Sequence, residues 1–364
     1  MRVSVARPRA ALWLALALLL VPAAGAAQQD VEGTRVTFGA FVDAYYAYDF
    51  GRPPDGDRVY TTQPARSEEF NVNLAFVEAR LAGDRVRGRV ALQAGTSVQR
   101  NYAGEPTRGT VSGPEVAQFI QEAVAGVRIR EGLWVDGGIY FSHIGQEGWI
   151  SRDNPTYTRS FTADFTPYYQ AGVKLSWQAT PTLSAQLNVI NGWQNISENN
   201  TSKAVGLRVE WQVAQGLLLG YDNFIGNERP DSLASATRVF NEVFARFTPR
   251  DGTDLWATAN LGVEDGDTWY SVTLIGRQRL GRAVSISARL ERYADPDQVI
   301  VVTGSAGGFE AWGASVGVDV GIAGRALWRT ELRGMTTGEP LLPDGNAPPR
   351  DEGGVAVSSL SITF

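Results

Sequence analysis

Cysteine is missing from this 364-residue sequence, and histidine occurs only once, as His143. Without cysteine the chain can form no disulfide, no thiolate zinc site and no cysteine nucleophile. A single histidine also excludes metal sites that need two. Ser142 cannot use the adjacent His143 as a base at a strand end, because successive strand residues point to opposite faces. We therefore expect no enzyme, no cofactor and no metal site.

Basic charge and long apolar segments are also scarce. The 33 basic residues are outnumbered by 39 acidic ones, which gives no support for nucleic-acid binding. The one long apolar run, residues 10–21, follows three arginines and precedes Ala24-Gly25-Ala26, which fits an A-x-A cleavage site. We predict that residues 1–27 are a cleaved secretory signal peptide. Residues 28–364 should form a single domain, because no linker divides them.

The sequence instead shows repeated alternation of apolar and polar residues. Between Asp164 and Gln178 every odd position is apolar or proline, and Tyr168 alone breaks the polar or small set at the even positions. Because the whole sequence is only 43% apolar, this pattern indicates a strand with one apolar face. Segment 68–81 keeps the pattern but changes parity between Phe76 and Val77, which predicts a β-bulge.

The connections between such segments alternate in length. Short ones, such as Gly281-Arg282, alternate with longer segments rich in glycine, proline and asparagine, and the one short exception lies at residues 265–267. Outer-membrane barrels have short periplasmic turns and long extracellular loops in this order, whereas a soluble sandwich has no reason to place its long loops at one end. We predict an all-β fold: a transmembrane antiparallel up-and-down β-barrel of about 16 strands, with 14 or 18 as alternatives. The strand candidates are roughly 35–50, 68–81, 85–99, 117–130, 133–143, 164–178, 183–192, 203–213, 217–225, 238–248, 254–264, 268–279, 283–293, 309–322, 326–335 and 354–364.

The last segment places Leu360, Ile362 and Phe364 on one face of a strand. Taken alone, it fits the edge strand of a soluble sheet as well as the closing strand of a membrane barrel. The alternating lengths of the connections favour the membrane barrel. We therefore expect the last segment to pair with 35–50 and 326–335, and to place Phe364 against lipid at the periplasmic rim. Terminal strands of this kind resemble those that the barrel-assembly machinery reads.

The polar face of a membrane barrel lines its lumen, and several candidate lining residues are cations. A solvated wall is the ordinary explanation for such a row, and a basic pore wall that tunes selectivity is the sharper one. The pore-lining candidates are Arg85, Arg87, Arg89, Arg128, Arg130, Lys174 and Arg208. Loop 144–163 could fold inward or stay outside as a cap, and its constriction candidates are Arg152, Asp153 and Arg159. Aromatic residues should gather at the membrane interfaces, and the girdle candidates are Trp177, Trp211, Phe247 and Phe364.

Seven stretches together resemble the OmpL-like β-barrel porins of bacterial outer membranes. They are DAYYAYDF (43–50), TTQP (61–64), FNVNLA (70–75), SHIG (142–145), NPTYTRS (154–160), PYYQAGVKL (167–175) and NGWQ (191–194). The resemblance implies an integral outer-membrane barrel that acts as a porin, with no catalytic residues to carry over.

We therefore expect a water-filled channel for passive diffusion of small hydrophilic solutes or ions, with the sign of its selectivity open. The alternative is a non-conducting outer-membrane barrel that serves as a receptor, adhesin or structural protein of the envelope. Expected partners are outer-membrane lipid, lipopolysaccharide, the assembly machinery and small solutes, without nucleic acid. A homotrimer stays open, because no motif indicates one.

Overall fold

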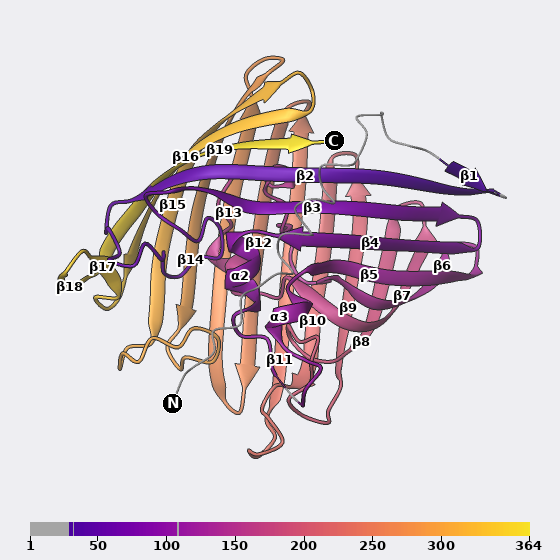
Figure 1. Ribbon diagram of the computed structural model, residues 1–364, viewed down its shortest axis with the longest axis horizontal. Helices are drawn as coiled ribbons and strands as arrows, with labels where there is room; N and C mark the ends of the chain where they lie inside the picture. Colours follow the sequence, from indigo (N-terminus) through magenta and orange to yellow (C-terminus); the bar gives the residue numbers. More distant parts are fainter. Residues whose placement is uncertain (1–28, 32, 108) are drawn as a thin grey trace, which may run out of the picture.

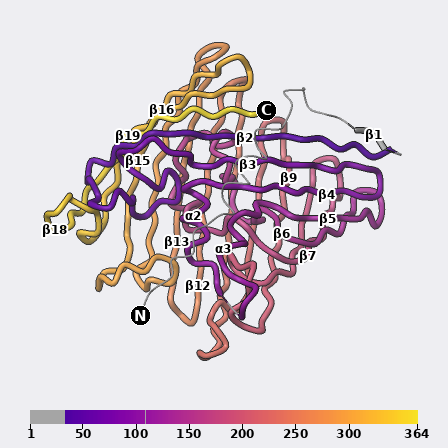
Figure 2. Tube along the Cα trace, viewed as in Figure 1, coloured from indigo at the N-terminus to yellow at the C-terminus, as the bar shows by residue number. Residues whose placement is uncertain are grey.

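The computed structural model describes residues 29–31, 33–107 and 109–364, and it shows a closed antiparallel barrel (Figure 1). The predicted signal peptide lies outside these residues. Within them, sixteen strands form the wall, as the sequence predicts. Figure 2 shows β2–β4 crossing the line of the later strands at a steep angle, as tilted strands on opposite walls of a barrel do. The wall strands are β2 (Thr34–Asp49), β3 (Phe70–Gly83), β4 (Val86–Ala94), β5 (Ile120–Arg130), β6 (Leu133–Phe141), β7 (Tyr169–Thr180), β8 (Leu183–Ile190), β9 (Ala204–Ala214), β10 (Leu217–Asn227), β11 (Thr237–Arg250), β12 (Thr253–Glu264), β13 (Asp267–Arg279), β14 (Val284–Asp295), β15 (Phe309–Ile322), β16 (Ala326–Thr337) and β19 (Glu352–Thr363).

Shorter elements lie in the connections and at the start of the described chain. Strand β1 (Gln29–Val31) pairs with the first residues of β2, and β17 (Leu342–Asp344) pairs with β18 (Ala347–Arg350). No helix in the described part of the chain is long and apolar enough to cross a membrane. The helices are α2 (Thr96–Tyr102), α3 (Pro114–Ala117), the 3-10 helix η2 (Ser151–Asp153) and α4 (Phe161–Asp164).

The barrel closes between its last and first wall strands. Val355 pairs with Asp49 and Thr363 with Phe41, while the other side of β19 pairs with β16. The backbone N–H of Phe364 donates to the carbonyl of Ala40 at 2.9 Å, and its side chain is exposed. The predicted pairing of the terminal strand is confirmed.

The polarity of the two faces of the wall is the reverse of that in a soluble protein: apolar side chains point outward and polar ones point inward. On β15 the outward Val316 is 59% exposed, whereas its inward neighbour Ser315 is 4% exposed. Such alternation suits a wall whose outer solvent is lipid and whose polar groups face the lumen. The predicted orientation of the apolar faces is confirmed by this pattern along most wall strands.

Strand β3 contains the predicted bulge, but at a different place. Asp43 pairs with Leu74 and the next residue of β2 pairs with Val72, so the extra residue is Asn73. Its side-chain amide donates to Asp43 at 2.9 Å. Because the parity changes at Asn73 and not after Phe76, Leu74 and Phe76 are buried. The expectation that both lie on the outward apolar face was wrong.

At the extracellular end, aromatic side chains from the inner face of the wall and from one connection pack together. Trp193, from the connection after β8, meets Phe240 of β11 with ring centroids 5.0 Å apart, and Phe240 stacks on Trp269 of β13 at 6.3 Å. Trp269 lies flat across Gly262, where a Cβ atom would stand 2.0 Å from the indole. The lumen therefore narrows at this end through packed side chains.

Candidate functional site

Residues 142–168, which connect β6 to β7, fold into the barrel, and we call them the lumen loop. Their side chains are mostly buried, and they contain η2 and α4. A backbone buried in this way must find hydrogen-bond partners for its N–H and C=O groups. The inner wall supplies them with charged side chains.

The first part of the lumen loop is held by β9, β10 and β11. Arg208 donates to the carbonyl of Gly145 at 3.0 Å, and the N–H of Gly145 donates to Asp222 at 3.1 Å. Arg208 and Asp222 also form an ion pair at 3.0 Å. Arg246 donates to the carbonyl of Gln146 at 2.7 Å. One cation and one carboxylate therefore bind a donor and an acceptor of the same loop residue.

The middle of the loop rests on β15, β16 and β2. Arg329 donates to the carbonyls of Ser151 at 2.6 Å and Pro155 at 2.9 Å, and it pairs with Asp319 at 2.8 Å. The hydroxyl of Ser151 donates to Asp43 at 2.8 Å. These contacts fix η2 against the wall on the side where the barrel closes.

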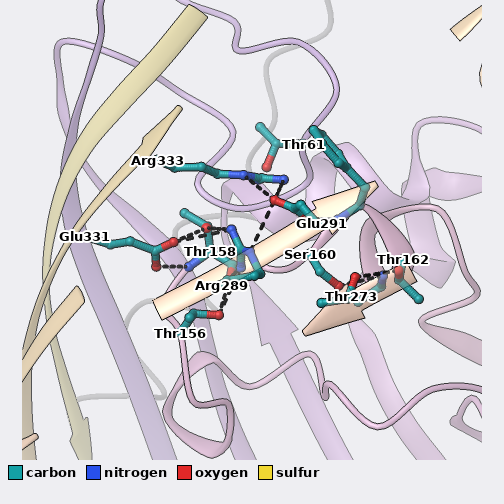
Figure 3. A network of polar contacts seen from close by, with 12 residues as sticks. Thr61, Thr156, Thr158, Ser160, Thr162, Thr273, Arg289, Glu291, Glu331 and Arg333 are labelled. Carbon is teal, nitrogen blue, oxygen red and sulfur yellow. Dashed lines mark hydrogen bonds and ion pairs between the residues drawn. The ribbon is translucent and has the colours of Figure 1, made fainter. Parts of the chain in front are cut away.

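The last part of the loop meets a row of alternating charges on β14 and β16 (Figure 3). Glu331 accepts hydrogen bonds from the N–H groups of Tyr157 at 2.7 Å and Thr158 at 2.8 Å, and from the Thr158 hydroxyl at 2.6 Å. Arg289 donates to the carbonyl of Thr158 at 2.5 Å and lies 3.3 Å from Glu331. The side chains of Arg289 and Glu331 are at most 1% exposed.

Beside this pair, Glu291 accepts from the N–H of Phe161 at 2.6 Å and pairs with Arg333 at 2.8 Å. The Arg333 guanidinium also lies over the Phe161 ring, 4.5 Å from its centroid. Removing one partner of such a buried ion pair typically costs about 3–5 kcal/mol, because the other charge stays desolvated. The loop position is thus specified by paired charges.

The loop encloses a small cavity on its own inner side. This cavity of about 170 Å³ is lined by Phe141, Trp149, Tyr168 and loop residues that include Glu147 and Arg159. Glu147 accepts hydrogen bonds from the N–H and hydroxyl of Ser160, yet burial raises the pKa of its carboxyl above the ordinary value.

A sixteen-stranded barrel with a long connection folded into its lumen is a porin architecture, and a family comparison agrees. The family model described as "Putative beta-barrel porin-2, OmpL-like" matches residues 35–364. The chain belongs to this family of OmpL-like porins. No curated protein sequence matches it significantly.

Solved structures share the fold of this porin at low sequence identity. OmpT of Vibrio cholerae is 10% identical with a TM-score of 0.60, and the match covers 93% of this chain and 100% of that one. The outer-membrane channel DcaP of Acinetobacter baumannii is 12% identical, covers 93% and 100%, and has a TM-score of 0.62. An anion-selective porin from Comamonas acidovorans is 11% identical, covers 91% and 100%, and has a TM-score of 0.59. The chain is an integral outer-membrane protein and not an enzyme.

The predicted pore-lining cations of the porin fall into four situations. Arg87 and Arg89 lie on the inner face of β4 and are neutralised, Arg87 by Asp136 at 2.6 Å and Arg89 by Glu78 at 2.6 Å. Arg208 holds the lumen loop, as described above. The Lys174 ammonium lies 4.4 Å from the Tyr140 ring centroid. Among the described residues no carboxylate pairs with it, although Asp136 is close enough to interact electrostatically.

Arg85, Arg128 and Arg130 lie together at the periplasmic rim. They line a pocket of about 470 Å³ with Ile129 and Glu131. Arg130 follows a bulge and pairs with Leu133, so its backbone no longer continues the alternation of β5. These three cations share one place at the mouth of the barrel.

The predicted constriction residues are inside the barrel but differ in exposure. Arg152 reaches the periplasmic end of the wall, where it donates to the carbonyl of Arg325 at 2.9 Å and to the Thr363 hydroxyl at 2.5 Å. Asp153 is exposed beside it. Arg159 is 2% exposed and lies over the Tyr168 ring at 3.8 Å, so it supports the loop from within.

The girdle candidates Trp177, Trp211, Phe247 and Phe364 are all exposed and lie near the turn ends of β7, β9, β11 and β19. Trp328 near the start of β16 is also exposed, and its indole N–H donates to Ser358 at 2.8 Å. Their role at the membrane interface stays a prediction.

Sequence reasoning missed the residues that hold the lumen loop from β14 and β16. Arg289 with Glu291, and Arg329 with Glu331 and Arg333, stand two residues apart along their strands. The available signal was the presence of both positive and negative residues at every second position on the polar face of a strand. Considering the cations alone does not reveal this pattern.

Proposed function

We propose that this porin conducts small hydrophilic solutes through a narrow, water-filled passage whose width is set by the lumen loop. The observation that carries the proposal is the binding of the loop backbone to both members of buried ion pairs, such as Arg289 and Glu331. A loop held in this way stays inside the lumen and excludes larger solutes. Arg152 and Asp153 would then face the narrow part of the passage.

The accessible charges of the wall favour anions. Wall carboxylates such as Asp136, Glu291 and Glu331 each have an arginine partner, and Asp43 and Glu242, which form no ion pair among the described residues, are buried. By contrast, neither Lys174 nor Arg128 has a carboxylate within ion-pair distance in the described part of the chain. Uncompensated charges of one sign along a low-dielectric passage raise the local concentration of counter-ions. We infer a modest preference for anions.

Reconstitution in planar bilayers tests both statements. Channel function predicts stepwise conductance in potassium chloride, and anion preference predicts a reversal potential displaced toward the chloride equilibrium potential in a salt gradient. Lys174→Gln should reduce the displacement, because it removes an unpaired lumen charge. Lys203→Gln is the matched control, because Lys203 lies in an outer connection and pairs with Glu198. Folded protein without conductance would refute the channel, and displacement toward potassium would refute the preference.

The packed aromatic cluster at the extracellular end favours one alternative, a barrel that does not conduct and acts as a receptor or structural protein. Trp193, Phe240 and Trp269 all lie on the lumen side. If they close the passage, Trp269→Ala should create conductance that the wild type lacks. Conductance in the wild type would instead place the passage beside this cluster.

We also propose a homotrimer that uses the wall around the closure. The shortest wall strands are β8 with eight residues and β4 and β6 with nine, against fourteen in β11 and β15. The outward positions near the closure include small residues such as Ala79 and Ala356, which allow close approach. OmpT of Vibrio cholerae has been solved in a trimer form. Native mass spectrometry should show trimers, which Ala79→Trp disrupts and Val316→Trp on another part of the wall does not.

The remaining partners follow from the membrane setting. We propose that the outward apolar face contacts outer-membrane lipid, with lipopolysaccharide at the extracellular end. The last strand, which ends in the exposed Phe364, is proposed as the segment that the barrel-assembly machinery recognises.

A further inference from the structure

The periplasmic ends of β4 and β5 place two like charges opposite each other. The N–H of Arg128 donates to the carbonyl of Arg85 at 2.9 Å, and the next pair in the ladder is Val86 with Val127. Val86 and Val127 are exposed on the outer face. Because successive residues alternate in direction, Arg85 and Arg128 are adjacent on the lumen face. Like charges directly opposite in an antiparallel pair destabilise it.

The same wall shows how such a pair is normally compensated. Arg80 and Arg89 are also direct cross-strand partners, on β3 and β4. The carboxylate of Glu78 lies between them and forms ion pairs with Arg80 at 3.0 Å and with Arg89 at 2.6 Å. Nothing equivalent bridges Arg85 and Arg128 in the part of the chain that the structure describes.

A third guanidinium and an open space complete the arrangement. Arg130 lines the same pocket of about 470 Å³, whose one carboxylate, Glu131, pairs with none of the three arginines among the described residues. Guanidinium groups bind carboxylate and phosphate oxygens through paired N–H donors. A bound oxyanion would take the place that Glu78 takes higher on the wall.

We propose that Arg85, Arg128 and Arg130 form a binding subsite for multivalent oxyanions at the periplasmic mouth. The class comprises small soluble solutes that carry a phosphate or several carboxylates. The lumen direction of Arg85 and Arg128 favours a dissolved solute over a lipid headgroup. The inference rests on the proposed channel function for its role, since the subsite would receive anions at one end of the passage.

Calorimetric titration of inorganic pyrophosphate into the detergent-solubilised porin at low salt tests the subsite without requiring conductance. Wild type should bind at one site per chain. Arg85→Gln with Arg128→Gln should weaken binding roughly tenfold or more, because two charge-assisted contacts are lost. Arg85→Lys with Arg128→Lys keeps the charge but not the planar fork, and should give intermediate affinity.

The matched control is Arg250→Gln with Arg279→Gln, which removes equal charge from the periplasmic ends of β11 and β13. It should leave pyrophosphate affinity unchanged. Equal weakening in the control, or no binding by wild type, would overturn the subsite. Heat-modifiable migration on gels verifies folding, and if the double glutamine variant does not fold, Arg128→Gln alone must show weaker binding.

The source of the anion is tested by adding phosphatidylglycerol to the micelles. Unchanged pyrophosphate affinity supports a soluble ligand, whereas competition would assign the subsite to a lipid headgroup and overturn that part of the proposal. Folded porin that binds pyrophosphate but does not conduct would refute the proposed function and leave the subsite standing.

Discussion

Glu331 is the wall residue whose replacement should release the lumen loop most directly. Its carboxylate accepts three hydrogen bonds from Tyr157 and Thr158, at 2.6 to 2.8 Å, and its side chain is 1% exposed. Glu331→Gln keeps the size of the side chain. However, it leaves one acceptor oxygen and turns an amide donor toward loop groups that are themselves donors.

The magnitude follows from those contacts. A hydrogen bond to a charged acceptor contributes about 1.5–3 kcal/mol. The amide oxygen of glutamine can replace Oε2, which accepts both N–H groups, so the contact of the Thr158 hydroxyl with Oε1 is the one lost. The docked state of the loop should weaken by about 1.5–3 kcal/mol, and the lower figure already changes the equilibrium between docked and undocked loop by roughly tenfold. Since the loop is proposed to narrow the passage, Glu331→Gln should show larger mean conductance and more frequent transitions between conductance levels than wild type.

Single-channel recording in planar bilayers measures both quantities. The control is Glu310→Gln, which makes the same chemical change at a partly exposed carboxylate that pairs with Arg292 and does not contact the loop. Wild-type conductance and gating in folded Glu331→Gln protein would refute the conclusion that this carboxylate holds a constriction.

Three further outcomes are expected. Arg152→Ala removes the contacts with Arg325 and the end of β19, so it should raise conductance, read by bilayer recording; an unchanged value would exclude Arg152 from the constriction. Burial raises the pKa of Glu228, which accepts from the N–H of Trp193, to about 7. Because the folded state then binds the extra proton, stability should fall by no more than about 3 kcal/mol as pH rises from about 4.5 through 7. Thermal melts from pH 4 to 8 should show this slope in wild type and a flatter one in Glu228→Gln. Phe364→Ala should slow assembly into membranes with little effect on the conductance of folded channels, and pulse-chase appearance of heat-modifiable protein measures the delay; normal assembly would argue against recognition of this residue.

The wall was predictable because lipid and lumen impose different requirements on alternate residues. In β7, Val173 and Trp177 are exposed on the outer face while Gln170 is fully buried inside, and the sequence carries that alternation directly. The turn at Asp265-Gly266 was also predictable, because an Asp-Gly pair favours a tight turn between strands. Both residues adopt positive φ in the connection between β12 and β13. Local patterns therefore sufficed for strand number and for pairing of the terminal strand.

The course of the lumen loop was not predictable in the same way. A loop has no periodicity, so residues 144–163 fitted an inward and an outward position equally well. The bulge at Asn73 shows a related difficulty. Leu74 and Phe76 are apolar, but they face inward to pack with Trp149, Tyr168 and other side chains from the connections. Their orientation depends on contacts with loops that lie far away in the sequence.

The charges of the inner wall become intelligible once the loop is placed. A water-filled tube needs no alternating rows of buried arginine and glutamate, because water would satisfy them. The side chains of Arg289 and Glu331 are instead buried from solvent. Each forms a hydrogen bond with a backbone group of Thr158, and the two also pair with each other. A loop backbone offers both N–H donors and C=O acceptors, so a wall that binds it needs both signs of charge. By this argument the paired charges of β14 and β16 position the loop, whereas the unpaired cations of β5 and β7 are the ones that we propose act on solutes.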